Sequence, residues 1–167
     1  MEEHGAMGRT STGGRASFRP IRPDDAAFLY EVYASTRLDE LAVVDWDEAH
    51  TAALLHMQFA AQHQCSQERY TQTDFLIILR DAVPVGRLYV ARWQDEIRIV
   101  DIALLPPYRN TGIGTAILRG ILAEAAVAHQ PVRIHVEKFN PALRLYERLG
   151  FAPIEDKGVY LFMEWSP

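Results

Sequence analysis

The chain has 167 residues, of which 49% are hydrophobic and 23% are charged, a balance that suits one compact domain and argues against a wholly disordered chain. Its formal net charge of -5 argues against nonspecific binding to nucleic acid or to an anionic membrane surface. The single cysteine, Cys65, excludes an intrachain disulfide, and no apolar run reaches the ~20 residues that a membrane-spanning helix needs. We therefore expect a cytoplasmic protein.

The N-terminal stretch is rich in Gly, Ser and Thr and lacks the apolar core of a signal peptide. We expect residues 1–16 to form a disordered leader and residues 17–167 to form a single domain. A short strand is predicted at Phe18–Ile21. A first helix follows, because apolar residues recur at helical spacing; these are Phe28, Leu29, Val32 and Tyr33.

A second helix is predicted at Asp47–His63, whereas the stretch before it, Thr36–Trp46, has no clear period. Three apolar runs joined by tight turns then predict an antiparallel meander; they are Phe75–Leu79, Val85–Trp93 and Ile97–Leu105. The C-terminal half predicts a long helix, a strand, a short helix and a final strand, at Gly112–His129, Val132–Val136, Pro141–Leu149 and Val159–Trp165. This succession indicates an α+β domain with a mixed sheet.

One segment combines a strand end, a short loop and the start of the long helix. The first backbone N–H groups of a helix have no intrahelical partner, and the helix dipole favours negative charge there. Gly112 and Gly114 have no Cβ, so an anion can approach the backbone closely. Arg109 adds a fixed positive charge with forked donors. The segment Arg109–Thr115 is therefore a candidate phosphate-binding loop.

Two common nucleotide-binding motifs do not fit this loop. A P-loop requires a lysine directly after its second glycine, and no lysine follows either glycine. A Rossmann fingerprint requires a third glycine where this chain has Ile117. Taken by itself, the loop is equally consistent with a strand-to-helix turn whose glycines serve only tight packing.

Two blocks of the sequence resemble the GNAT superfamily, the acyl-CoA-dependent N-acetyltransferases. The first is Arg-x-x-Gly-x-Gly at residues 109–114, which follows a strand and a Pro-x-Tyr step and resembles the coenzyme A loop of that family. The second is Asn140–Phe151, and the resemblance extends over about Phe18–Trp165. It implies a mixed, mostly antiparallel central sheet with helices on both faces and a splayed pair of parallel strands.

The resemblance also implies acetyl-CoA as the cofactor, held between the two splayed strands. The backbone of Ile102, Ala103 and Leu104 would contact the acetyl carbonyl and the pantetheine arm. Asn140 would hydrogen-bond that arm, and Tyr146 would direct its hydroxyl at the sulfur. The pyrophosphate would lie beside Arg109 and among the N–H groups of Asn110, Thr111, Gly112, Ile113, Gly114 and Thr115.

The chain departs from the family pattern at two points. The spacing from Asn140 to Tyr146 is one residue shorter than usual, which tightens the loop after the fifth strand. Asn110 stands where a glycine is very common, but Asn tolerates left-handed backbone conformations better than most residues.

The implied reaction is direct attack of a primary amine on the thioester in a ternary complex. An alkylammonium group has a pKa near ~10.4 and must first lose a proton, so a base is required. Asp101, the one acidic residue in an apolar strand, either serves as that base or pairs with Arg87 or Arg98. His135 either serves as the base or is a hydrogen-bonded sheet histidine. Tyr146 is the candidate acid.

Arg37, Glu40 and Trp46 lie in or beside the aperiodic stretch, which often forms the wall of the acceptor site in this family, and they are candidate substrate contacts. A small-molecule amine is the expected acceptor, because the chain has no spare domain for a large partner. The alternatives are a protein N-terminus or lysine, and a noncatalytic acyl-CoA-binding module. We expect no metal site and no nucleic acid or membrane partner, and homodimers are common in the resembled family.

Overall fold

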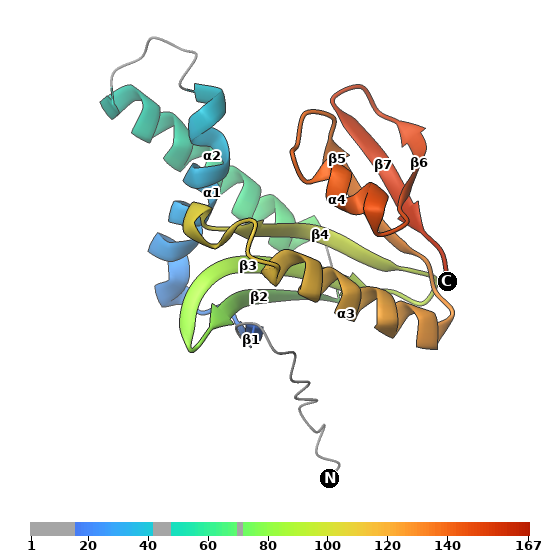
Figure 1. Ribbon diagram of the computed structural model, residues 1–167. Helices are drawn as coiled ribbons and strands as arrows, with labels where there is room; N and C mark the ends of the chain where they lie inside the picture. Colours follow the sequence, from blue (N-terminus) through green and yellow to red (C-terminus); the bar gives the residue numbers. More distant parts are fainter. Residues whose placement is uncertain (1–15, 42–47, 70–71) are drawn as a thin grey trace.

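The structure is a computed structural model that describes residues 16–41, 48–69 and 72–167 (Figure 1). In these ranges the chain forms seven strands, four α-helices and two short 3-10 helices. In chain order the elements are β1 (Ala16–Pro20), η1 (Pro23–Asp25), α1 (Ala26–Leu41), α2 (Glu48–Arg69), β2 (Thr73–Arg80), β3 (Val83–Arg92), β4 (Ile97–Leu104), η2 (Pro106–Tyr108), α3 (Ile113–Ala128), β5 (Val132–Glu137), α4 (Leu143–Arg148), β6 (Ala152–Asp156) and β7 (Tyr160–Trp165). The predicted leader lies outside the described residues except for Ala16, which begins β1.

All seven strands belong to one sheet, in the order β1-β2-β3-β4-β5-β7-β6. Neighbouring strands are antiparallel except β4 and β5, which run parallel. The predicted α+β class, with a mostly antiparallel sheet and one parallel pair, is confirmed. The predicted meander is β2–β4, and its first turn uses Asp81 and Ala82, both at positive φ, as a tight hairpin between right-twisted strands requires.

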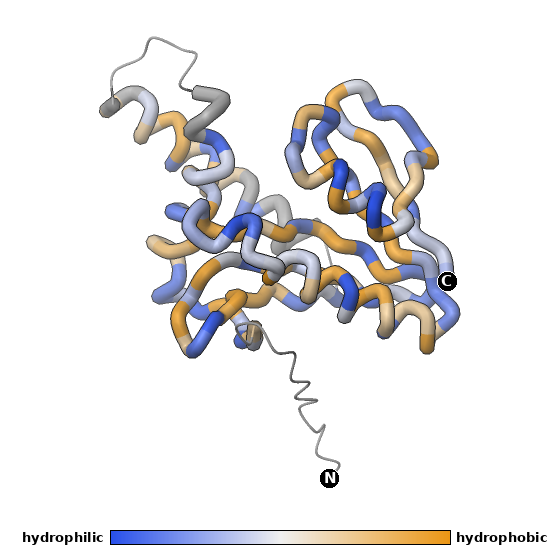
Figure 2. Tube along the Cα trace, viewed as in Figure 1, coloured by the Kyte–Doolittle hydropathy of each residue, from blue (hydrophilic) through white to orange (hydrophobic). Residues whose placement is uncertain are grey.

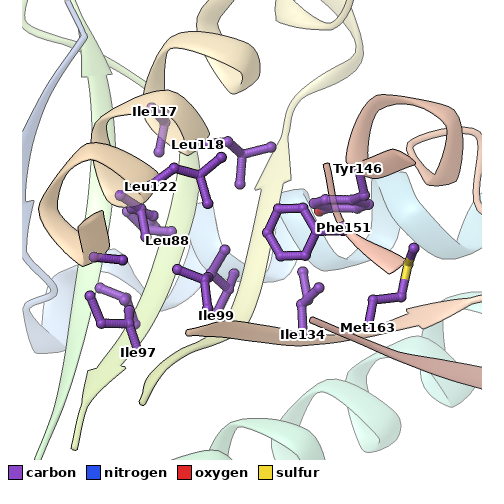
Figure 3. Packing of buried hydrophobic residues seen from close by; sticks show 14 of the residues in the cluster. Leu88, Ile97, Ile99, Ile117, Leu118, Leu122, Ile134, Tyr146, Phe151 and Met163 are labelled. Carbon is purple, nitrogen blue, oxygen red and sulfur yellow. The ribbon is translucent and has the colours of Figure 1, made fainter. Parts of the chain in front are cut away.

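The sheet separates two apolar cores. On one face, α3 and α4 cover strand residues that include Leu88, Ile99 and Ile134, and Figure 3 shows how closely these side chains pack. On the other face, α1 packs against β3 and β4 and buries Leu29 and Val32. Figure 2 shows apolar residues along the central strands and α3, as a sheet covered on both faces requires. Helices on both faces of the sheet are therefore confirmed.

The long helix α3 buries one apolar stripe. Its buried positions recur at intervals of three to five residues, which places them on one side of an α-helix; they are Ile113, Ile117, Leu118, Ile121, Leu122 and Ala125. Ala116 and Gly120 lie outside this stripe and are exposed.

Two elements differ from the sequence expectation. Helix α1 continues to Leu41, so the start of the stretch that has no clear period is helical. The tertiary contact of α1 with the sheet and with α2 supplies the order that local periodicity does not show. Strand β6 was not predicted, because all five of its residues are exposed and it includes Pro153. An edge strand needs no buried face, so it carries no alternating apolar pattern.

Gly86 in β3 tests how tightly β4 is held. A Cβ at this position would lie 2.2 Å from the carbonyl oxygen of Ala103, so Gly86→Ala must push the two backbones apart. We expect a loss of about 1–3 kcal/mol in the free energy of unfolding, measured by urea denaturation. Gly120→Ala, in α3, is the matched control, because a Cβ at that position would meet nothing within 4 Å. We expect it to raise the free energy of unfolding by about 0.5–1 kcal/mol. Equal effects of the two substitutions would contradict this account.

Candidate active site

The parallel strands β4 and β5 pair over three residues and then separate. The register joins Ile97 to Val132 and Ile99 to Ile134, and no later residues of the two strands pair (Figure 1). Opposite β3, Tyr89 pairs with Asp101 and Val90 pairs with Ile99, so β4 carries an extra residue at 100. Such a bulge bends the strand that contains it. We call residues 100–104 and 135–137 the β4–β5 fork.

Alternate residues of β4 direct their backbone polar groups into the fork. The N–H of Leu105 donates to Val85 O, toward β3, whereas Leu104 O accepts from Arg109 Nε, away from β3. Because this direction alternates along an antiparallel pair, the backbone groups of Ile102 point away from β3, as those of Leu104 do. Ala103 therefore directs its backbone groups into the β3 ladder, so its predicted backbone contact with a ligand does not fit the register.

The loop between η2 and α3 presents a row of backbone N–H groups. Asn110 and Gly112 both adopt left-handed conformations, with φ of 57° and 88°, as expected for these residue types. In the described part of the chain, no backbone carbonyl accepts a hydrogen bond from the N–H groups of residues 110–115, and no side chain caps α3. These groups and the positive end of the helix dipole form an anion-binding geometry.

Arg109 does not direct all its donors at this anion position. Its Nε donates to Leu104 O at 2.9 Å, and one terminal nitrogen donates to Ser35 Oγ at 3.2 Å and Ser35 O at 3.4 Å. The guanidinium thus links the loop to the end of β4 and to helix α1. Its predicted place beside the pyrophosphate stays a prediction.

Tyr146 lies on α4, at the edge of the core that underlies the fork. Its side chain is buried, and its ring meets Phe151 edge to face with 5.6 Å between centroids (Figure 3). Burial first, and the negative charge of Asp101 second, raise the pKa of the Tyr146 phenol above its ordinary value near 10. The phenol therefore stays protonated at neutral pH, and the carboxylate of Asp101 lies within its electrostatic range.

Asp101 forms the ion pair that the sequence analysis named as one of its two alternatives. Its Oδ2 lies 2.5 Å from Arg87 Nε, and both atoms are buried. The two groups attract each other as opposite charges. The Asp101 side chain as a whole is 29% exposed. Because Oδ2 is buried, that exposure belongs to the rest of the side chain, and of the two oxygens only Oδ1 can contribute to it.

His135 lies on the opposite face of β5 from Ile134, which packs in the α3–α4 core. Its ring stacks on Phe162 with 4.4 Å between centroids, and its Nε2 lies 3.1 Å from Lys157 Nζ. Burial first, and the positive charges of Lys157 and Arg98 next, lower the pKa of His135. The imidazole is therefore neutral at pH 7, with Nε2 accepting from Lys157, and that nitrogen is engaged before any substrate proton arrives.

Of the remaining predicted site residues, Asn140 and Arg37 each have a partner in the structure. Asn140 Oδ1 accepts from the N–H of Ala142 at 2.9 Å, so this oxygen helps to start α4. Arg37 Nη1 lies 3.4 Å from Glu137 Oε1, which links α1 to the end of β5 at the fork. The side chain of Glu40 and all of Trp46 lie outside the described residues. The charge of Asp101 thus acts on Tyr146, and Arg37 binds Glu137 at the end of β5.

Two residues of the site were missed or left undecided by sequence reasoning. Arg87 appeared only as one of several partners of Asp101, and Ser35 was not named at all. Both act across the sheet or between distant elements, so no local spacing could reveal them. The signal that was present is the rarity of an arginine within a buried strand, since a buried charge requires a partner.

A model of the acetyltransferase (GNAT) family matches residues 26–151. The match spans β4, the loop, α3 and α4, and the chain belongs to this family. Enzymes of the family take the acetyl group from acetyl-CoA. The predicted membership of the GNAT superfamily is therefore confirmed, and so is acetyl-CoA as the cofactor that this family uses.

Individual relatives are distant. An N-alpha-acetyltransferase from Sulfurisphaera tokodaii is 33% identical over 60 residues, which cover 34% of this chain and 36% of that relative. The PaiA N-acetyltransferase from Thermoplasma acidophilum, solved in complex with coenzyme A, is 18% identical with a TM-score of 0.69, over 92% of this chain and 99% of that one. The ribosomal-protein-S18-alanine N-acetyltransferase from Escherichia coli is 16% identical with a TM-score of 0.59, over 91% and 94%. These likenesses show the fold.

The described residues contain no helix that is both long and apolar enough to cross a membrane. Across residues 16–41, 48–69 and 72–167 there is no group of three or more His, Cys, Asp and Glu side chains that could hold a metal ion.

The contact between Lys157 and His135 generates a titration prediction. Replacing Lys157 with Met removes a positive charge that disfavours the imidazolium, so we expect the midpoint of His135 to rise. It should stay below the ordinary value near 6.5, because burial is the larger cause and is retained. NMR titration of the His135 ring measures both midpoints. Lys138→Met is the control, since Lys138 pairs with Asp156 instead, and it should leave the midpoint unchanged. An unchanged midpoint in Lys157→Met would contradict the assigned contact.

Proposed function

We propose that this chain transfers the acetyl group of acetyl-CoA to the primary amine of a small molecule, by direct attack of the amine in a ternary complex. The observation that carries the proposal is the β4–β5 fork, where two parallel strands part after three residue pairs. The N–H row of residues 110–115 follows one arm of the fork, and Tyr146 lies in the core beneath it. Membership of the family supports acetyl-CoA as the donor.

The loop fits a pyrophosphate group. A Cβ at Gly112 would meet nothing within 4 Å, and one at Gly114 would meet only Leu104 Cδ1, at 3.9 Å. The backbone is therefore open to an anion, and the N–H groups of residues 110–115 would hold it. The Arg109 link to Ser35 keeps this loop in place against α1. When bound, acetyl-CoA supplies a thioester whose carbonyl carbon accepts the amine.

The arms of the fork supply the remaining polar contacts. The backbone groups of Ile102 and Leu104 lie along the free edge of β4, where an extended ligand arm would add to the sheet. A backbone N–H on this edge would stabilise the negative charge that develops on the thioester oxygen. Removal of one such donor typically costs ~3–4 kcal/mol in other enzymes.

Tyr146 acts as a hydrogen-bond donor to the leaving sulfur. A thiol has a pKa near ~8.5, by analogy with cysteine. Because the pKa of the Tyr146 phenol is raised above 10, full proton transfer from the phenol to the thiolate is uphill. The phenol therefore stabilises the thiolate by a hydrogen bond, and the thiolate takes its proton from solvent. This refines the acid role that the sequence assigned to Tyr146.

Asp101 is the proposed base. The new C–N bond forms as the C–S bond breaks, and the amine proton passes to Asp101 Oδ1, directly or through a water molecule. Of the two oxygens of this carboxylate only Oδ1 can be exposed, since Oδ2 is buried against Arg87. His135 is the weaker candidate, because Lys157 already engages its Nε2.

A protein amine is the second candidate acceptor. The Sulfurisphaera tokodaii relative is named as an N-alpha-acetyltransferase, and its 33% identity supports an acceptor with a free α-amino group. A noncatalytic acyl-CoA module is the third alternative, and it would bind coenzyme A without needing the Asp101–Tyr146 pair.

A panel of acceptors tests these functions together. The full chain is incubated with acetyl-CoA and with small primary amines, peptides with free N-termini, or lysine-containing peptides blocked at the N-terminus, and thiol release is followed. We expect turnover with at least one small amine and slower turnover with both peptide sets. Faster turnover of free-N-terminus peptides would transfer the assignment to a protein substrate. Calorimetric binding of coenzyme A without turnover of any amine would favour the noncatalytic module.

Tyr146→Phe tests the hydrogen bond to sulfur. A hydrogen bond to a charged group is worth about 1.5–3 kcal/mol, so we expect kcat to fall roughly 10- to 150-fold. The dissociation constant of acetyl-CoA should change little, because the hydroxyl acts on charge that develops only during transfer. Tyr160→Phe, at an exposed tyrosine of β7, is the control and should leave kcat unchanged. A wild-type kcat in Tyr146→Phe would remove the assigned role.

A further inference from the structure

Arg87 is a buried cation on the strand next to the fork. It lies on β3 opposite Ala103, two residues from the position where Tyr89 pairs with Asp101. Only 4% of its side chain is exposed, and its Nε contacts Asp101 Oδ2. A guanidinium keeps its charge at any pH at which a protein is folded. Burying such a charge is unfavourable unless its surroundings compensate it, so its place beside Asp101 requires an explanation.

We propose that Arg87 is a positioning residue for acetyl transfer: by holding Asp101 Oδ2, it fixes the direction in which Oδ1 meets the acceptor amine. The proposal rests on the function proposed above. A carboxylate rotates about its side-chain torsions unless one oxygen is held. Here Oδ2 is buried against Arg87, so of the two oxygens only Oδ1 can be open to a substrate or a water.

The surrounding groups agree with a role at the fork. Arg87 and Asp101 both act electrostatically on Tyr89, whose pKa is raised first by burial. The charge of Asp101 also acts on Tyr146, and that of Arg87 acts on His63 of α2. Asp101 thus interacts electrostatically both with Arg87 and with Tyr146. A purely structural ion pair would need no connection to the hydroxyl that we assign to the leaving sulfur.

Arg92, the other arginine of β3, differs from Arg87 in its burial, its partners and its distance from the fork. Arg92 contacts Asp74 and Glu124, and its side chain is 42% exposed. It lies at the far end of β3, beside the paired part of β4 at Ile97. Arg92→Met is therefore a matched control, since it removes an arginine and its carboxylate contacts from the same strand without touching the fork.

A double-mutant cycle tests the proposal. Arg87→Met, Asp101→Asn and the double variant are compared for kcat and for the dissociation constant of acetyl-CoA. We expect each single variant to lower kcat by about 10- to 100-fold, as small misplacements of catalytic groups do. The double variant should be no slower than Asp101→Asn alone, because Arg87 acts through Asp101. Acetyl-CoA binding should change by less than about twofold, and Arg92→Met should match the wild type.

Acceptor basicity provides a second readout that a structural role would not change. If Arg87 serves proton removal, its loss matters less for amines that are already deprotonated at the assay pH. We expect the deficit of Arg87→Met to shrink across a series of acceptors of falling pKa. Arg87→Lys should recover part of kcat, because it returns a positive charge without the planar guanidinium. Melting curves identify misfolded variants; if Arg87→Met is unfolded, Arg87→Lys and the double variant, which lacks both charges, carry the test.

The outcomes separate the two proposals. Wild-type turnover in Asp101→Asn would show that the proposed base is wrong, and the positioning role would fall with it. Slow turnover in Asp101→Asn together with wild-type turnover in Arg87→Met would leave the proposed function intact and overturn the role of Arg87. Multiplicative losses in the double variant, or a deficit that is the same for every acceptor, would also overturn it.

Discussion

The separation of β4 from β5 is the constraint on which the rest of the structure depends. Backbone N–H and C=O groups of a strand need partners, and the edge of β4 beyond Ile99 has none on β5. The chain does not close this gap with another strand. Instead β5 pairs over its whole length with β7, and β4 pairs with β3 on its other edge. The free edge is thus built into the sheet order, where an extended ligand can add to it.

Packing on both faces keeps the strands apart. The extra residue at 100 bends β4. The aromatic pair of Tyr146 and Phe151 packs in the same core as Ile99 and Ile134, the last paired residues of the two strands. On the opposite face, α1 contacts Glu137 of the β5 arm through Arg37. Through Ser35 it also contacts Arg109, which donates to Leu104 O at the end of the β4 arm. Closing the fork would require these contacts to be broken, so the opening is held before any ligand arrives.

Much of this arrangement could be predicted from local sequence. The strand, loop and helix around Gly112 follow from residue preferences within a few positions, and even the left-handed conformation of Asn110 was foreseeable. Side-chain contacts across the sheet could be named only as alternatives, or not at all. The bulge at 100 decides that Asp101 faces Arg87 and that Ala103 directs its backbone to β3. The engagement of His135 by Lys157 joins residues 22 positions apart, which no periodicity links. The order of α1 up to Leu41 depends on tertiary contacts in the same way.

The charges around the fork bear on the kind of amine that the proposed function would use. Asp101 faces Arg87 and Glu137 faces Arg37, so the carboxylates described here are each compensated by a guanidinium. Such pairs attract a second cation weakly, because the two fields largely cancel. An amine acceptor attacks a thioester only through its neutral form. For an alkylamine with a pKa of ~10.4 that form is roughly one molecule in two thousand at pH 7, whereas for an α-amino group with a pKa near ~8 it is about one in ten. If the fork binds acetyl-CoA as proposed, a less basic amine would place less demand on Asp101, the proposed base.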